Sequence, residues 1–338
     1  MDEKNKIDQE MHPIIEIPPA REIRVLVVTN AYPTDKSPGN PSIKEQVSAL
    51  RKLGVNIDLL IIKTGNKASY LKAAYSLFLL SFQKKRFDII HAYYGLCGLL
   101  ARLQFKYPLI VTFLGSDLLG VKGKKQKASR DSVIGRIIAR LADVIIVMTQ
   151  EMKCITHRED AYVIPFGIDL DLFQPFPKEQ ARLELRIPLS KKLILFPWRP
   201  ERAEKRFDIV QGAFQILEKQ FEDLRVVTIS NESHERVVKY MCACDVMVLA
   251  SDHEGSPVTI REAIACGLPI VSVAVGDIAE TIAGIDGCYL CERNPKDMAD
   301  KIGLVLKRGQ RIFGYHKIRT ITGDWTAEQI YRVYERFI

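Results

Sequence analysis

The sequence lacks any apolar run long enough to cross a membrane. Its longest apolar stretch, residues 73–82, is interrupted by Ser76 and Ser81 and is far shorter than the roughly 20 residues that a transmembrane helix needs. The first 13 residues are polar and of mixed charge, without the apolar segment of a signal peptide. We therefore expect a cytoplasmic protein with no membrane-spanning segment.

Cysteine is scarce, with seven residues in a chain of 338. An odd number of cysteines without a secretion signal excludes a disulfide framework and predicts reduced thiols. Cys242 with Cys244, and Cys288 with Cys291, have the short spacings of zinc ligands, but packed thiols show the same spacings. We assign no metal to them.

No GxGxxG motif is present, so a nicotinamide site gains no support. The length predicts two domains of about 150 residues, and 47% hydrophobic with 27% charged residues is typical of a globular chain. Lysine and arginine number 49 against 41 acidic residues, a net charge of +8. This excess fits phosphates, anionic lipid or nucleic acid equally well.

Strand-like and helix-like segments alternate along the first half of the chain. Helical patterns at 42–53 and 132–142 separate some of the apolar runs, which predicts a parallel sheet with helices on both faces. The expected strands are 23–28, 55–62, 87–92, 108–113, 143–148 and 161–166.

Residues 165–177 carry three prolines and a glycine, a density that neither a helix nor a central strand tolerates. We place the domain boundary there: an N-terminal domain over 1–172, a second βα domain over 173–322, and a helix within 323–338 that packs back toward the first. The expected elements of the second domain are strands 192–197, 224–229, 245–250 and 269–275, and helices 205–219, 233–243, 258–266 and 277–283.

The segment 251–282 carries the most chemistry. Gly255 and Ser256 form a turn after a buried strand, Ser256 fits a helix N-cap, and Pro257 fits the first helical position. The free amides of such a helix start hold phosphate. Glu254 would lie in the loop and Glu262 in the second helical turn, so both carboxylates would accept hydroxyl hydrogen bonds from one ligand.

Two cations follow the first strand of the second domain. Arg199 and Lys205 both fall at the carboxyl edge of the sheet, where they would neutralise the charge on a diphosphate leaving group. The alternative is a solvated basic loop, because Arg202 and Arg206 lie nearby.

These residues resemble the GT-B glycosyltransferases of family 4, also called glycosyltransferase group 1, over most of the chain. Arg199 and Lys205 match the arginine–loop–lysine signature of that family, and Pro165, Gly167 and Asp169 match its interdomain PxGxD. The family also has a signature of two glutamates separated by seven residues. It is matched here by Glu254, Gly255, Glu262, Ala263, Cys266, Gly267, Pro269 and Val271.

The resemblance implies two Rossmann-like domains that face a central cleft and transfer a sugar from a nucleoside diphosphate sugar. It implies that Glu262 binds the ribose, that Arg199 and Lys205 bind the diphosphate, and that transfer retains the anomeric configuration without a metal or other cofactor. Glu254 would bind the donor sugar together with the backbone that follows it, namely Gly255, Ser256, Pro257 and Val258.

The first domain matches the family less closely. His91 and Asp117 fall in segments that border the acceptor and donor sugar in the family, and Gly39 falls in the loop that admits donor phosphate. Tyr93 and Leu114 stand where the family commonly has histidine, and leucine cannot donate a hydrogen bond. Trp198 replaces the glycine usual before the arginine.

The implied acceptor is a saccharide or a lipid-linked saccharide, as in cell-surface polysaccharide or glycolipid biosynthesis. Residues 67–86 combine apolar side chains with basic ends. They form either a helix that covers the first sheet or an interfacial helix at the inner, anionic face of a membrane. In the second case Lys122, Lys124, Lys125 and Lys127 would contribute.

Three other functions are weighed against this one. An epimerase of the same fold would convert a sugar nucleotide without an acceptor. A metal-dependent transferase would use the DxD of Asp169 and Asp171, whose place in the proline-rich linker favours a structural role instead. A nucleic-acid-binding protein would explain the charge, but no motif for it is present, so nucleic acid is the least favoured partner.

Overall fold

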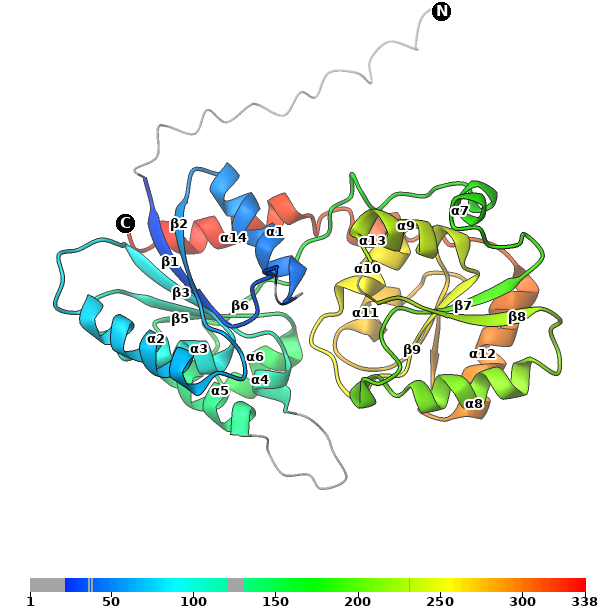
Figure 1. Cartoon of the computed structure of the whole chain (residues 1–338), viewed down its shortest axis with the longest axis horizontal. Coiled ribbons are helices and arrows are strands. Elements are labelled where there is room, and N and C mark those ends of the chain that lie inside the picture. The colour runs from blue at the N-terminus through cyan, green and yellow to red at the C-terminus, as the bar shows by residue number, and fades with distance from the viewer. Residues whose placement is uncertain (1–21, 36, 38, 121–129, 231) are drawn as a thin grey trace, which may run out of the picture.

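The computed structural model describes residues 22–338 except 36, 38, 121–129 and 231, and these form two α/β domains (Figure 1). Each domain is built around a parallel sheet, with six strands in the first and five in the second. The predicted fold class is therefore confirmed. Within these described ranges, no helix is both long enough and apolar enough to cross a membrane.

The first sheet has the strand order β2-β1-β3-β4-β5-β6. The order reverses between β1 and β3, and such a switch point opens a crevice at the carboxyl ends of the strands. The last strand is shorter than the predicted 161–166 because Pro165 has no amide hydrogen for a ladder. The strands are β1 (Arg24–Thr29), β2 (Asn56–Ile61), β3 (Ile89–Tyr93), β4 (Leu109–Thr112), β5 (Val144–Val147) and β6 (Tyr162–Val163).

Helices cover both faces of this sheet. Helix α1 packs against α14 on one face, whereas α2, α3 and α5 pack together on the other. Asn40 caps α1 through its side chain and Pro41 opens the helix, as the sequence pattern at 42–53 predicts. The helices are α1 (Pro41–Lys52), α2 (Lys67–Leu80), α3 (Gly95–Ala101), α4 (Ser116–Leu119), α5 (Arg130–Leu141), α6 (Gln150–Thr156) and α14 (Gly323–Glu335).

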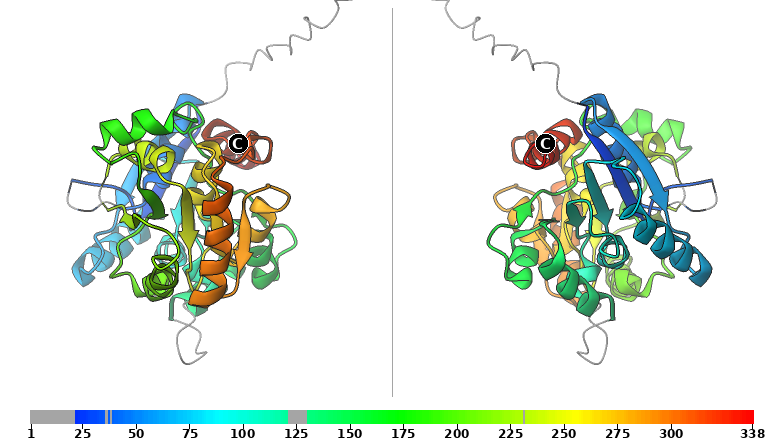
Figure 2. Two further views of the ribbon diagram at one scale, coloured as in Figure 1. Left: turned by 90° about the vertical axis from the view of Figure 1, so that its right-hand side faces the viewer. Right: turned by 90° about the vertical axis from the view of Figure 1, so that its left-hand side faces the viewer.

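The second sheet has the order β11-β10-β9-β7-β8, with its switch point between β7 and β9. Helices flank the strands in both domains, as the side views of Figure 2 show. The strands are β7 (Lys192–Phe196), β8 (Leu224–Thr228), β9 (Val246–Leu249), β10 (Ile270–Val273) and β11 (Tyr289–Cys291).

Two apolar cores lie on opposite faces of this second sheet. One is formed with α8 and α12, and the other with α7, α9, α10, α11 and α13. The bounds are α7 (Lys178–Glu184), α8 (Phe207–Leu217), α9 (His234–Ala243), α10 (Val258–Ala265), α11 (Ile278–Ile282), α12 (Pro295–Arg308) and α13 (Tyr315–Ile318).

The second domain differs from the sequence prediction in the start of one helix and in several additional elements. Helix α8 begins at Phe207 instead of 205, because Arg206 takes a left-handed φ of 54° after a short 3-10 turn at Ala203–Lys205. Helix α7, strand β11 and helices α12 and α13 lie in stretches for which the sequence predicts no element. The signal for α12 is Asn294, which caps the helix, followed by Pro295.

The chain crosses between the domains twice, and the two crossings are hydrogen-bonded to each other. The amide of Ile168 donates to the carbonyl of Ile321 at 3.0 Å, and the amide of Gly323 donates to the carbonyl of Ile168 at 3.2 Å. A Cβ on Gly167 would lie 2.3 Å from the carbonyl oxygen of Thr322, so only glycine allows this approach. After the second crossing, α14 returns to the first domain (Figure 1).

A buried polar network fixes α14 to the first domain. The Nδ1 atom of His91 lies 2.6 Å from the Tyr334 hydroxyl, and its Nε2 atom lies 2.7 Å from Thr112 Oγ1. Its ring stacks on Tyr93, whose hydroxyl donates to Gln46 Oε1 at 2.6 Å. Burial lowers the pKa of His91 to about 3, so the imidazole is neutral and both ring nitrogens are used inside the core.

Tyr334→Phe removes the hydroxyl that meets His91 and keeps the ring. We expect it to lower the free energy of unfolding by about 1–3 kcal/mol, because a buried ring nitrogen loses its partner. The measurement is urea unfolding followed by circular dichroism. Tyr331→Phe, on the same helix and only half-buried, is the control and should stay within about 0.5 kcal/mol of the wild type. Equal midpoints for the two variants would contradict the role of the network.

Candidate functional site

A cavity of about 370 Å³ opens between the two domains at the carboxyl ends of their strands. The loop after β4 forms one wall, and the loops after β7 and β9 form the other. In doubly wound domains this edge is where ligands bind. The lining residues are Leu114 and Ser116 from the first domain, and Arg202, Glu204, Lys205, His253, Glu254 and Gly255 from the second.

An ion pair between Lys205 and Glu254 lies at the centre of the second-domain wall. Lys205 Nζ is 2.5 Å from Glu254 Oε1, and the two side chains are only 7% and 13% exposed. The ammonium also lies 4.4 Å from the ring centroid of Trp198, a cation–π contact. The left-handed turn at Arg206 and the preceding 3-10 turn bring Lys205 to this position. The site thus holds a largely desolvated cation between a carboxylate and an indole.

The domains meet through glycine backbone beside this pair. A Cβ on Gly255 would lie 2.8 Å from the carbonyl oxygen of Leu114, and a Cβ on Gly115 would lie 3.2 Å from Gly255 Cα. On the other side of the same loop, a Cβ on Gly276 would lie 2.1 Å from the Gly255 oxygen. Three backbone segments are therefore stacked at distances that side chains would prevent.

Asp117 shapes the first-domain part of this stack. Its buried carboxylate accepts hydrogen bonds from the amides of Gly95 at 2.9 Å, Leu114 at 3.0 Å and Gly115 at 2.9 Å. Burial raises its pKa to about 6, and these amides oppose the shift. Asp117 therefore orders the turn from inside the fold, and its predicted acceptor-side role stays a prediction. His91 is fully buried, and its two ring nitrogens lie within hydrogen-bond distance of Tyr334 and Thr112, so its acceptor-side role also stays a prediction.

Ser256 does not cap α10 as predicted. The helix begins at Val258 with Pro257 at the N-cap and no side-chain cap bond. The Ser256 hydroxyl instead donates to Asp277 Oδ2 at 2.7 Å and accepts from Arg261 Nη2 at 2.7 Å. Val258 packs on the apolar core of the first domain, so the start of α10 lies at the interface between the domains.

A second charged contact crosses between the domains. His234 lies at the start of α9, and its Nδ1 atom is 3.2 Å from Glu45 Oε1 of α1. The hydrogen bond to Glu45 raises the pKa of His234. Both residues act electrostatically on Glu262. Burial raises the pKa of Glu262 to about 7, His234 opposes this shift and Glu45 adds to it. Glu262 is therefore poised between its neutral and ionised forms near neutral pH.

Two predicted residues, Arg199 and Gly39, lie outside the lining of this cavity, whereas His253, for which no role is predicted, belongs to it. Arg199 is exposed in the loop after β7 and is not among the eight residues that line the cavity. Gly39 takes a φ of 52°, and a Cβ there would lie 2.6 Å from the Ala31 oxygen, so glycine shapes the loop before α1. His253 lines the cavity, and its buried Nδ1 has no hydrogen-bond partner among the described residues.

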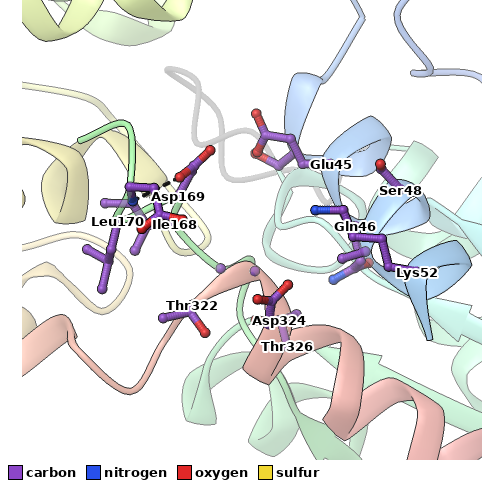
Figure 3. Close-up of a pocket in the computed structure, with 15 residues that line it drawn as sticks. Glu45, Gln46, Ser48, Lys52, Ile168, Asp169, Leu170, Thr322, Asp324 and Thr326 are labelled. Atoms are coloured by element: carbon purple, nitrogen blue, oxygen red, sulfur yellow. Dashed lines mark hydrogen bonds between the residues drawn. The ribbon is translucent and has the colours of Figure 1, made fainter.

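Another cavity, of about 400 Å³, lies at the hinge (Figure 3). It is enclosed by α1, the 167–171 linker and the start of α14, and the labelled side chains of α1 face those of the linker across it. The DxD of Asp169 and Asp171 is found here. Asp169 Oδ1 accepts the amides of Asp171 and Leu172, both at 3.0 Å, which is a turn-forming role. Among the described residues no His, Cys, Asp and Glu side chains form a group of three or more with metal-site geometry.

Sequence reasoning missed the partners of several site residues. The sequence pattern marks Trp198 only as a replacement for glycine and does not indicate its contact with Lys205, and it marks neither Arg261 nor Asp277. Glu45 and His234 meet across 189 positions of sequence, and no local pattern marks such a pair. One signal in the sequence points to this network: Arg261 is a charged residue at a position of α10 that the helical pattern places on the buried face.

Two family models match the chain. Residues 19–172 match Glycosyltransferase Family 4, and residues 193–308 match Glycosyl transferases group 1. The two matched stretches contain the first and the second sheet, respectively.

Relatives and solved structures agree with this match. The D-inositol 3-phosphate glycosyltransferase of Mycolicibacterium smegmatis is 26% identical over 66% of this chain, which spans 60% of the length of that relative. Sucrose-phosphate synthase from Thermosynechococcus elongatus has a TM-score of 0.78 at 18% identity, covering 94% of this chain and 99% of that one. Anabaena HepE in complex with UDP-glucose has a TM-score of 0.68 at 14% identity, covering 93% and 100%.

Glu262→Gln removes a carboxylate whose pKa is raised in the folded protein. A raised pKa means that the folded state loses stability as pH rises from the unfolded value near 4.5 to the folded value near 7. We expect Glu262→Gln to raise stability at pH 8 by on the order of 1–3 kcal/mol and to change it little below pH 4.5. Thermal unfolding across this pH range checks the prediction. A difference that is the same at every pH would show that Glu262 is not strained by burial.

Proposed function

The chain belongs to the GT-B glycosyltransferases of family 4, also called group 1, and from this we propose that it transfers a sugar from a nucleoside diphosphate sugar to a saccharide or lipid-linked acceptor. The observation that carries the proposal is the Lys205–Glu254 pair, desolvated in a cavity between two Rossmann-like domains. A solved neighbour of this fold holds UDP-glucose, which makes uridine diphosphate sugars the first donors to test.

Lys205 is the residue that would meet the leaving diphosphate. Its ammonium is held in a site of low exposure by Glu254 and Trp198, where a fixed cation stabilises developing negative charge far better than in water. When the diphosphate binds, its oxygens would share the Lys205 ammonium with Glu254. The Glu254 carboxylate could then accept hydrogen bonds from the hydroxyls of the donor sugar. Arg199, on the same loop, would approach the diphosphate from the exposed side.

Glu262 and the start of α10 would bind the rest of the donor. Glu262 accepts the ribose hydroxyls as a carboxylate, so a bound nucleotide would hold it in the ionised form. Gly255 lines the cavity, and the backbone amides of Gly255, Ser256 and Val258, at the start of α10, would donate to phosphate and sugar oxygens.

In the proposed reaction the bond between the anomeric carbon and the diphosphate oxygen breaks, with its electron pair leaving on the diphosphate. The acceptor hydroxyl oxygen bonds to the same carbon, and its proton leaves on the diphosphate. We propose retention of configuration, as the family resemblance implies. We also propose no requirement for a metal, because Lys205 and Arg199 would supply positive charge at the leaving group and Asp169 accepts the amides of a turn. The catalysis then comes from positioning and electrostatics.

The proposed enzyme is tested with a panel of nucleoside diphosphate sugars, scored first by thermal shift and then by turnover with saccharide, inositol phosphate and lipid-linked acceptors. Lys205→Ala and Glu254→Ala should each lower kcat by about 100-fold or more, as loss of one preorganised charge does. Lys219→Ala, an exposed lysine just after α8, is the control and should keep full activity. Unchanged turnover in Lys205→Ala would refute the site.

We propose further that the enzyme works at an anionic membrane surface on the cytoplasmic side, a reducing compartment that suits its seven free cysteines. The support is an apolar patch on α2 and beside it, where Leu71 is 72% exposed, Phe82 67% and Phe105 66%. The ring of Phe82 contacts those of Phe78 and Phe105. Exposed basic residues lie on α2 and close in sequence to Phe82 and Phe105, namely Lys67, Lys72, Lys84, Lys85, Arg86 and Lys106.

Exposed apolar side chains together with nearby basic residues are typical of a surface that binds a membrane with anionic headgroups. The lysines at 122, 124, 125 and 127, which the sequence analysis assigned to the same surface, lie outside the described residues. The interfacial role of 67–86 therefore rests on the helix and on Phe105 alone.

Phe82→Ser with Phe105→Ser should reduce binding to vesicles of anionic lipid by about tenfold or more, because two buried rings are lost from the lipid interface. Vesicle flotation measures it, with purely zwitterionic vesicles as the second arm. Phe313→Ser, which changes a phenylalanine that is 91% exposed on the second domain, is the matched control and should bind like the wild type. Wild-type protein that floats with neither kind of vesicle would contradict the proposal.

A further inference from the structure

Arg261 is a buried cation directly beside the loop that carries Glu254 and Gly255. Its side chain is 3% exposed, and Nη2 donates to Ser256 Oγ at 2.7 Å and to the carboxylate of Asp277. Ser256 in turn donates to the same Asp277 oxygen at 2.7 Å. The three groups close a triangle that joins α10, the loop after β9 and the turn before α11.

The same turn also supports the loop through backbone contact. Gly276 precedes Asp277, and a Cβ on Gly276 would lie 2.1 Å from the Gly255 oxygen and 3.1 Å from the Glu254 oxygen. Because Asp277 is fixed by Arg261, the position of Gly276 is fixed as well. A shift of the Arg261–Asp277 pair would therefore move the backbone of Glu254 and Gly255.

A second buried arginine–aspartate pair in the same domain provides a comparison for the hydrogen bonding of Arg261. Arg182 and Asp245 have the same side-chain exposures as Arg261 and Asp277, 3% and 16%. Arg182 uses all of its nitrogens: Nε donates to the Ala243 carbonyl at 2.9 Å, Nη1 to the Leu189 carbonyl at 2.5 Å and Nη2 to Asp245 at 3.0 Å. Arg182 is thus a satisfied structural arginine.

Arg261, by contrast, leaves Nε and Nη1 buried with no hydrogen-bond partner within the described residues. Buried donors without partners destabilise a fold, and a buried ion pair contributes little net stability compared with apolar side chains of similar size. Stability therefore does not account for Arg261. Within the described part of the chain, the hydrogen bonds of Arg261 go to Ser256 and Asp277, the two residues that hold the loop of Glu254 in place.

We propose that Arg261 is a positioning residue, which acts through Ser256 and Asp277 to hold the Glu254–Gly255 loop where Glu254 meets Lys205 and the donor sugar. The effect on sugar transfer rests on the proposed function, whereas the effect on the loop does not. A displacement of about 1 Å in such a loop can lower a rate by about 100-fold.

The test uses the double variant Arg261→Met with Asp277→Asn in the full chain. It removes both buried charges together and leaves an acceptor for Ser256 at position 277. In the ligand-free protein we expect amide hydrogen exchange in 254–258 to accelerate by about tenfold or more, as local loosening does, with a thermal midpoint no lower than that of the wild type.

The kinetic readout separates positioning from nucleotide binding. The kcat for the best donor of the panel should fall by about 10- to 100-fold, while the Kd of the matching nucleoside, which carries the ribose but no diphosphate, stays within about threefold, because Glu262 is not on the loop. Arg261→Lys, which keeps one cation within reach of Asp277, should recover much of both the exchange protection and kcat.

Arg182→Met is the matched control. It breaks a satisfied pair, so we expect a lower thermal midpoint with exchange in 254–258 and kcat close to the wild type. Wild-type exchange and kcat in the double variant would overturn the proposal. Faster exchange across the whole second domain with a lower midpoint would also overturn it, since Arg261 would then be structural. Faster exchange confined to the loop, in a protein that turns over no sugar nucleotide, would uphold positioning and refute the proposed function.

Discussion

The close backbone contact between the domains is the constraint on which the site depends. Gly255 lies against Leu114 and Gly115 on one side and against Gly276 on the other, at distances that leave no room for a side chain. Because these segments follow strands of two different sheets, the contact fixes how the carboxyl ends of both sheets face each other. Lys205 and Glu254 acquire their shared cavity from this arrangement.

Each side of that contact is held by a buried carboxylate. Asp117 orders the first-domain turn through three amides, and Asp277 orders the second-domain turn through Arg261 and Ser256. Buried carboxylates are costly unless they are hydrogen-bonded, and the burial that raises the pKa of Glu262 is of the same kind. The region of the cavity therefore gathers several charged groups that are largely withdrawn from water.

The order of elements was predictable because buried parallel strands are continuous β-branched runs, and that order alone places Lys205 and Glu254 at one sheet edge. The side-chain partners were not predictable. His91 and Tyr334 are separated by 243 positions, so a strand-end histidine that reads as functional is in fact bonded to the last helix. Ser256 has the sequence of an N-cap, but its hydroxyl bonds to Asp277, 21 positions away. Local patterns report backbone preferences, not tertiary partners.

The contacts between the domains differ in strength from one end of the interface to the other. At the hinge, the two crossings are joined by backbone hydrogen bonds between Ile168 and the 321–323 segment. Beside the hinge cavity, which Glu45 lines, the ion pair of Glu45 and His234 is more than a third exposed on both sides, and such pairs contribute little stability. A motion that separates α1 from α9 about the crossings therefore breaks a weak contact and keeps strong ones. Since Glu45 and His234 both act on Glu262, the same motion changes the charge around the carboxylate proposed to bind the ribose.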